Sequence, residues 1–122
     1  MTFLQKAKEN LSAEKLCFEN GHFNACANRA YYSALHVATA ALRHHGIQRN
    51  RIDHGQVQAD FSGELVNRRK CYPARLKSYL SDMQFVRDKA DYTAGSVSRK
   101  MARRMLSKPE EMIRHIGEEI EK

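Results

Sequence analysis

The feature that most constrains this chain is an uninterrupted stretch without glycine or proline, bounded by Gly21 and Gly46. A stretch of this length predicts one long helix of about seven turns. Apolar residues recur within it at steps of three and four, the pattern of a helix packed on a core. The core-facing residues expected from this spacing are Phe23, Ala27, Tyr31, Ala34, Leu35, Ala38 and Leu42.

The other side of the same helix combines two polar residues with small ones. Arg29 and His36 are close to two turns apart, so their side chains leave one face about 10 Å apart along the axis. Ala25, Ser33 and Ala40 lie on that face around them. An ordinary solvated face would carry more lysine and glutamate, whereas small residues let another backbone or a ligand come close. We therefore expect this face to meet a partner or a ligand.

Four segments of the chain form a set of motifs. The central one, Asn28 to His36, reads NRAYYSALH, with six residues between its arginine and its histidine. The others are Ala13–Leu16 with Asn20–Phe23, then His54 with Val57 and Phe61, and finally Arg87 followed by Ala90–Tyr92. In this order they resemble the HEPN domain family and its N-R-x-Y-Y-x-A-x-H signature, which contains the Arg-x4-6-His element. The resemblance covers most of the chain.

Imidazole can exchange a proton near neutral pH, and guanidinium offers a planar fork for a phosphate. His36 can therefore act as general acid or base on RNA while Arg29 stabilises a charged phosphorane, without a metal. The resemblance implies a homodimer, because in HEPN domains the motif helices of two protomers meet and line one cleft. The dimer-interface residues expected on this basis are Ala25, Arg29, Ser33, His36 and Ala40.

The family resemblance also implies a role and a partner. It implies the toxin of a toxin–antitoxin pair, whose antitoxin is a small minimal nucleotidyltransferase. One position departs from the family pattern: established ribonucleases commonly carry a polar residue after the arginine, and this chain has Ala30. A second hypothesis is therefore a non-catalytic module that binds a nucleotide or a nucleotidyltransferase partner. A third is a plain helical interaction protein, in which substitutions of Arg29 and His36 are silent.

The basic residues are numerous and clustered, and the formal net charge is +7 over 122 residues. Such clustering favours a polyanion such as RNA, although an acidic protein partner would also match it. The most basic loop precedes Pro73. Tyr32, about 60° from Arg29 around the helix, either borders the cleft or packs between helices. The residues expected to contact RNA or phosphate are Tyr32, Arg43, Arg68, Arg69 and Lys70.

The length fits a single domain over residues 1–122, large enough to bury a core without metals or disulfides. Three cysteines without a C-x-x-C pair argue against a disulfide framework and a zinc site, and indicate a reducing cytosol. No signal peptide or membrane-spanning run is apparent, so we expect a cytoplasmic protein without membrane contact. The histidines lack matching carboxylates or thiolates, and no phosphate-binding glycine motif occurs. We expect neither a metal nor a cofactor.

The flanking segments predict further helices. Thr2 and Gln5 form a capping box for a first helix that ends near Glu19 and turns back antiparallel into the central one. A loop is expected from Gly46 to Gly55, followed by a short helix from about Gln56 to Arg68.

Two more helices complete the expected fold. Pro73 suits the first turn of the next helix, and Ser96 or Ser98 can cap the last one. Pro109 either kinks that last helix or divides it. Because no segment alternates at period two, the sequence predicts an all-α, antiparallel up-and-down bundle of four to six helices.

Two smaller features of the motif set concern its later segments. His54 either caps its helix or lines the cleft. Arg87 and Asp91 are four residues apart and can form an ion pair on a helix. The family resemblance suggests that this pair orders the segment leading to Tyr92, near the central helix.

Overall fold

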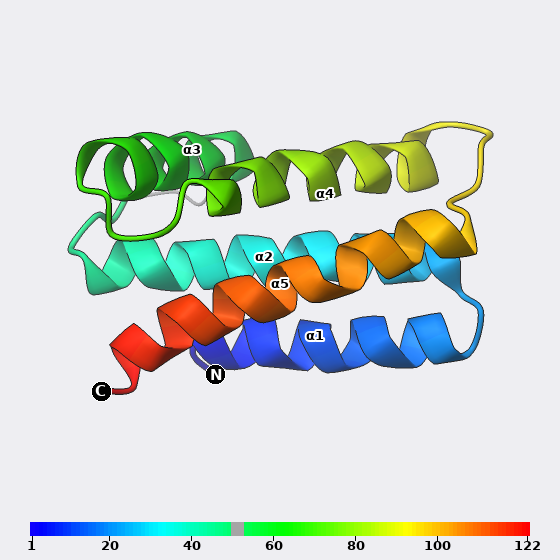
Figure 1. Cartoon of the computed structure of the whole chain (residues 1–122), viewed down its shortest axis with the longest axis horizontal. Helices are drawn as coiled ribbons and strands as arrows, with labels where there is room; N and C mark the ends of the chain where they lie inside the picture. Colours follow the sequence, from blue (N-terminus) through cyan, green and yellow to red (C-terminus); the bar gives the residue numbers. More distant parts are fainter. Residues whose placement is uncertain (50–52) are drawn as a thin grey trace.

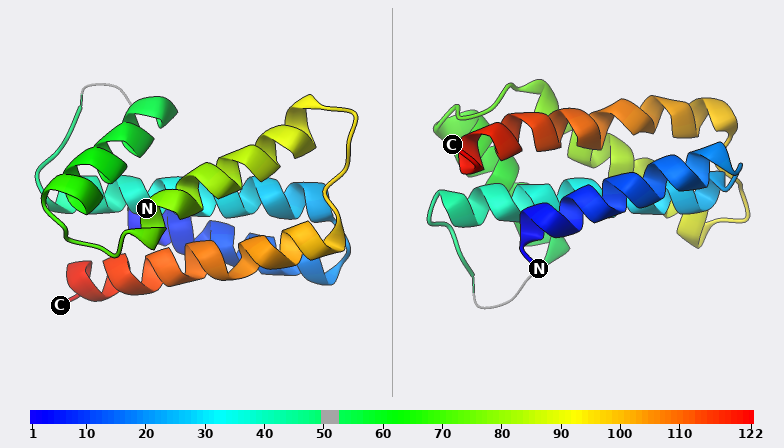
Figure 2. Two further views of the ribbon diagram at one scale, coloured as in Figure 1. Left: turned by 45° about the horizontal axis from the view of Figure 1, so that its top comes forward. Right: turned by 90° about the horizontal axis from the view of Figure 1, so that it is seen from below.

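The chain forms an antiparallel helical bundle, seen in a computed structural model that describes residues 1–49 and 53–122 (Figure 1). The four long helices of the described part alternate in direction, and a shorter pair of segments connects the second long helix to the third (Figures 1 and 2). The described residues contain no strand, so the prediction of an all-α up-and-down bundle is confirmed. The elements are α1 (Phe3–Glu19), α2 (Phe23–His44), α3 (His54–Asp60), the π-helical η1 (Phe61–Arg68), α4 (Arg75–Tyr92) and α5 (Arg99–Ile120).

The hairpin of α1 and α2 follows from local signals in the sequence. The Thr2 hydroxyl accepts from the Gln5 backbone N–H at 3.1 Å, and the Gln5 side chain accepts from the Thr2 N–H at 2.7 Å. This capping box starts α1 where it was predicted. Gly21 reverses the chain with a φ of +76°, a conformation that glycine adopts without a Cβ penalty. The hairpin brings the two helices side by side along their length.

Helix α2 is the centre of the bundle, in contact with α1, α3, α4, η1 and α5. The predicted core-facing residues are buried except Phe23, which is partly exposed. The side that was expected to be open is also largely covered, because α1 lies along it. The Ser33 hydroxyl donates to the backbone carbonyl of Ala7 at 2.8 Å, which requires a close approach of the two helices.

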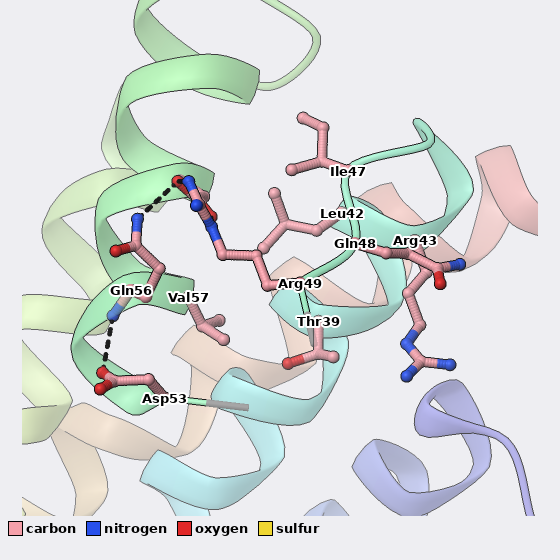
Figure 3. Close-up of a pocket in the computed structure, with 10 residues that line it drawn as sticks. Thr39, Leu42, Arg43, Ile47, Gln48, Arg49, Asp53, Gln56 and Val57 are labelled. Carbon is pink, nitrogen blue, oxygen red and sulfur yellow. Dashed lines mark hydrogen bonds and ion pairs between the residues drawn. The ribbon is translucent and has the colours of Figure 1, made fainter. Parts of the chain in front are cut away.

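The segment after α2 differs in detail from the prediction. Helix α3 begins at His54, two residues earlier than expected, because the Asp53 side chain accepts from the Gln56 N–H at 3.0 Å. The chain then winds more loosely as η1 instead of continuing as an α-helix. Arg49 holds the preceding loop to α3 by donating to both carboxylate oxygens of Asp60, at 2.7 and 2.9 Å. Figure 3 shows the Arg49 side chain extending from the loop towards α3. Residues 50–52 of the predicted loop lie outside the described residues.

The last helix, α5, is continuous through Pro109, whose ring is buried. The alternative of two separate helices is therefore wrong. Ser98, rather than Ser96, caps α5 by accepting from the Met101 N–H at 3.1 Å. Among the described helices, none is both long and apolar enough to cross a lipid bilayer.

Candidate functional site

One narrow strip of α2 remains open to solvent. Between Cys26 and Leu42 every residue of this helix is buried except four, which recur at helical spacing along one side. Side chains of α1, α3 and α4 surround the strip. In the right-hand view of Figure 2, α5 runs along the upper edge and the N terminus lies at the lower edge, with α2 between them. The four partly exposed residues are Asn28, Arg29, Tyr32 and His36.

Arg29 is held by neutral groups. Its Nη1 donates to the side-chain oxygen of Asn10 at 2.8 Å, and its Nε donates to that of Asn28 at 3.2 Å. The guanidinium carbon lies 5.3 Å from the centre of the Tyr32 ring. Within the described part of the chain, Arg29 forms no ion pair with a carboxylate. Its positive charge is therefore oriented but not neutralised, as a phosphate-binding group requires.

Asn28 links Arg29 to the end of α4. While its side-chain oxygen accepts from Arg29, its amide nitrogen donates to Asp91 at 3.0 Å. The same Asp91 oxygen lies 3.3 Å from Nε of Arg87, so the predicted ion pair of Arg87 and Asp91 is confirmed. A contact chain from α4 through Asn28 thus fixes the direction in which the Arg29 guanidinium points.

His36 is half-buried between aromatic rings. Its ring centre lies 5.8 Å from that of Phe3 and 6.4 Å from that of Tyr32. Burial lowers the pKa of His36 below its ordinary value, and the positive charges of Lys6, His54 and Arg29 lower it further. At neutral pH the imidazole is therefore uncharged and able to accept a proton.

His54 comes to the same place from α3. Its ring centre is 5.7 Å from that of Tyr32 and 6.4 Å from that of Tyr31. Since Asp53 supplies the helix cap, His54 lines the strip. Of the two alternatives left open by the sequence, the structure supports the second.

Arg87 lies among three tyrosines beside the strip. Its guanidinium carbon is 5.1 Å from the ring centre of Tyr31, 5.4 Å from that of Tyr32 and 5.5 Å from that of Tyr92. Its Nη2 donates to the hydroxyls of Tyr32 and Tyr92, each at 3.2 Å. Arg87 therefore contacts Tyr92 at the end of α4 and Tyr32 of α2, and the role of its ion pair with Asp91 in ordering this segment stays a prediction.

Two of the predicted interface residues lie away from the open strip. Ser33 is fully buried and Ala40 is 8% exposed within one protomer. The Ser33 side chain contacts α1, whereas Ala40 lines a surface hollow together with Phe3 and Leu4. Ala25 is exposed at the start of α2. The role of all five residues in a dimer interface stays a prediction.

The predicted phosphate-binding residues fall into two places. Arg43 lies over the Phe3 ring at 4.8 Å from its centre, and Phe3 in turn faces His36. Arg43 therefore extends the candidate site along α2. Tyr32 lies in the middle of the strip, between Arg29 and His36.

The basic loop before Pro73 lies away from the strip. Arg68 pairs with Glu64 at 2.7 Å, and Arg69 donates to the backbone carbonyl of His45 at 3.4 Å. His45 follows the last residue of α2, about 24 Å along the helix axis from Arg29. The structure therefore does not bring Arg68, Arg69 and the exposed Lys70 together with the strip, and Figure 1 shows their turn beside the C-terminal end of α2.

Asn10 and Phe3 are site residues that the sequence reasoning missed. In an antiparallel hairpin, residues equally far from the turn face each other. With the turn at Asn20 and Gly21, Asn10 falls two residues from the position opposite Arg29, and Phe3 falls two residues from the position opposite His36. The register of the predicted hairpin was therefore a signal that could have found both residues.

The comparisons with known proteins agree with this geometry. A family model described as HEPN domain matches residues 1–120, and the chain belongs to the HEPN domain family. No curated protein matches the chain. Membership supports a nuclease or RNA-related module, or a nucleotide-binding one. In the described ranges, no three His, Cys, Asp or Glu side chains are grouped so that they could hold a metal ion.

Proposed function

We propose that this protein is a metal-independent endoribonuclease that works as a homodimer, with Arg29 and His36 at the reacting phosphate. The observation that carries the proposal is their arrangement on the one open strip of α2. Arg29 has an oriented charge with neutral partners, and His36 has a pKa lowered by burial. These are the properties needed in a phosphate-binding group and a general base.

In the proposed reaction, neutral His36 removes the proton from a ribose 2′-hydroxyl. The 2′-oxygen then attacks the adjacent phosphorus, and Arg29 stabilises the added negative charge of the phosphorane. The 5′-oxygen leaves and takes up a proton. The products are a 2′,3′-cyclic phosphate and a 5′-hydroxyl, so no water or metal enters this step.

The homodimer is proposed because one strip supplies only one such imidazole and one such guanidinium. Two strips facing each other would place a second His36 near the leaving oxygen, where its protonated form can act as the acid. The exposed Ala25 would lie at the edge of this contact. Membership of the HEPN family supports this arrangement, since motif helices meet in that family.

We also propose that the nuclease is a toxin whose antitoxin is a nucleotidyltransferase-type protein. The motif set and the family membership support this role. Expression of the wild type is expected to arrest growth, and His36→Ala is expected not to. Relief of the arrest by a co-expressed nucleotidyltransferase would identify the partner, and equal arrest by both forms would contradict the proposed role.

A second candidate is a non-catalytic module that binds a nucleotide through Arg29. Ala30 favours it, because this residue is fully buried and adds no polar group beside Arg29. In this case Arg29→Ala loses nucleotide affinity while the wild type leaves RNA intact.

The test is incubation of single-stranded RNA with the protein in EDTA. The wild type is expected to release fragments with cyclic phosphate ends, and His36→Ala to be slower by about 100-fold or more. His115→Ala is the matched control, because His115 lies on α5 beside Glu111. Circular dichroism checks that each variant is folded. Equal cleavage by wild type and His36→Ala would overturn the nuclease proposal.

A further inference from the structure

Tyr92 is an aromatic side chain with a large exposed surface. It is the last residue of α4 and is 70% exposed. Its hydroxyl accepts a hydrogen bond from Nη2 of Arg87 at 3.2 Å, and the guanidinium lies over its ring. So little burial contributes little to folding, yet Arg87 contacts both the ring and its hydroxyl.

Arg87 connects this ring to the candidate site. The same nitrogen donates to the Tyr32 hydroxyl, and the Arg87 side chain is only 14% exposed. A carboxylate oxygen of Asp91 lies 3.3 Å from Nε of Arg87 and forms an ion pair with the guanidinium. A row of contacting groups therefore runs from Tyr92 through Arg87 to Tyr32. At the far end of this row, the Arg29 guanidinium lies over the Tyr32 ring.

We infer that the exposed surface of Tyr92 is a stacking platform for an unpaired base of single-stranded RNA whose phosphate lies at Arg29. Every base presents a flat π face, and stacking on an aromatic side chain is a general mode of single-strand binding. In a duplex those faces are covered by neighbouring base pairs. The platform thus makes the site selective for single-stranded RNA.

The inference rests on the RNA-binding part of the proposed function and not on catalysis. It is tested with a 2′-O-methyl RNA strand, which cannot undergo attack by a 2′-hydroxyl, carrying one 2-aminopurine base. Stacking of that base on a tyrosine quenches its fluorescence. Tyr92→Leu removes the ring, and Tyr92→Phe keeps it without the hydroxyl. Phe85→Leu is the matched control, because Phe85 is 71% exposed on the same helix but lies beside α5.

The platform predicts that the wild type quenches the probe and that Tyr92→Leu binds the single strand about tenfold more weakly, with the quenching lost. Tyr92→Phe and Phe85→Leu are expected to bind within about threefold of the wild type. Affinity for an RNA duplex is expected to be the same in all four proteins.

Other outcomes separate the two proposals. If the wild type binds and quenches the probe but cleaves no RNA, the nuclease proposal fails and the platform stands. If it cleaves RNA and Tyr92→Leu quenches the probe as the wild type does, the platform is wrong and the nuclease stands. Equal weakening of single-strand and duplex binding by Tyr92→Leu would also overturn the platform. A wild type that binds neither form of RNA contradicts both proposals.

Discussion

Glu14 offers a quantitative test of the packing of α1 on the bundle. Its side chain is fully buried, and neither carboxyl oxygen has a hydrogen-bond partner among the described residues. Burial raises the pKa of Glu14 from 4.5 to about 9, opposed by the charge of Lys15 and increased by that of Glu110. The folded protein therefore holds a protonated carboxyl at neutral pH, whereas the unfolded chain is ionised.

The sign and size of the pH effect follow from this shift. Because the folded pKa is raised, the full stability is present below pH 4.5 and is lost as the pH rises towards about 9. Each pH unit in this window lowers the free energy of unfolding by about 1.4 kcal/mol. Glu14→Gln keeps the shape but cannot ionise. Relative to the difference measured below pH 4.5, we expect Glu14→Gln to gain about 3 kcal/mol of stability over the wild type at pH 7.

The assay is urea unfolding followed by circular dichroism, at one protein concentration and at pH 5, 6, 7 and 8. The difference in unfolding free energy between Glu14→Gln and the wild type should grow with pH by about 1.4 kcal/mol per unit. Glu9→Gln is the control, because Glu9 is exposed on the same helix, and it should follow the wild type. A difference that stays constant from pH 5 to pH 8 would refute the reasoning.

Three further predictions concern the site and its supports. Ser33→Leu overpacks the contact between α1 and α2, so it should lower the free energy of unfolding, measured in urea, by about 3 kcal/mol. A variant as stable as the wild type would contradict the packing of Ser33 on Ala7. Arg87→Met removes two hydrogen bonds and an ion pair, and should lower the free energy of unfolding by about 2 kcal/mol. Arg87→Lys should not restore this stability, because a single ammonium cannot make the same contacts. The proposed dimer uses one neutral and one protonated His36. Because burial and positive neighbours lower the pKa of His36, RNA cleavage should follow a bell-shaped pH profile with its maximum below 6.5. His54→Gln should move that maximum upwards, and a wild-type maximum above 6.5 would contradict the use of two His36 side chains as base and acid.

The helices themselves could be predicted from the sequence, since their signals are local. The capping box at Thr2 and Gln5, the turn at Gly21 and the apolar spacing of α2 each act within a few residues. The ion pair of Arg87 with Asp91 follows from their spacing on one helix for the same reason. Glu14 lies seven residues after Ala7 and three after Leu11, two residues of α1 that pack on the core, so its burial could have been anticipated from helical spacing.

The identity of the open surface was decided only by the tertiary structure. Helical spacing placed Ser33 and Ala40 on one face with Arg29 and His36, but α1 covers the first two and leaves the others open. Which side of a helix is exposed depends on what packs against it, and that is set by contacts between residues far apart in the chain. The same contacts, between α1, α2, α3 and α4, bring Asn10, His54 and Tyr92 around the strip and lower the pKa of His36.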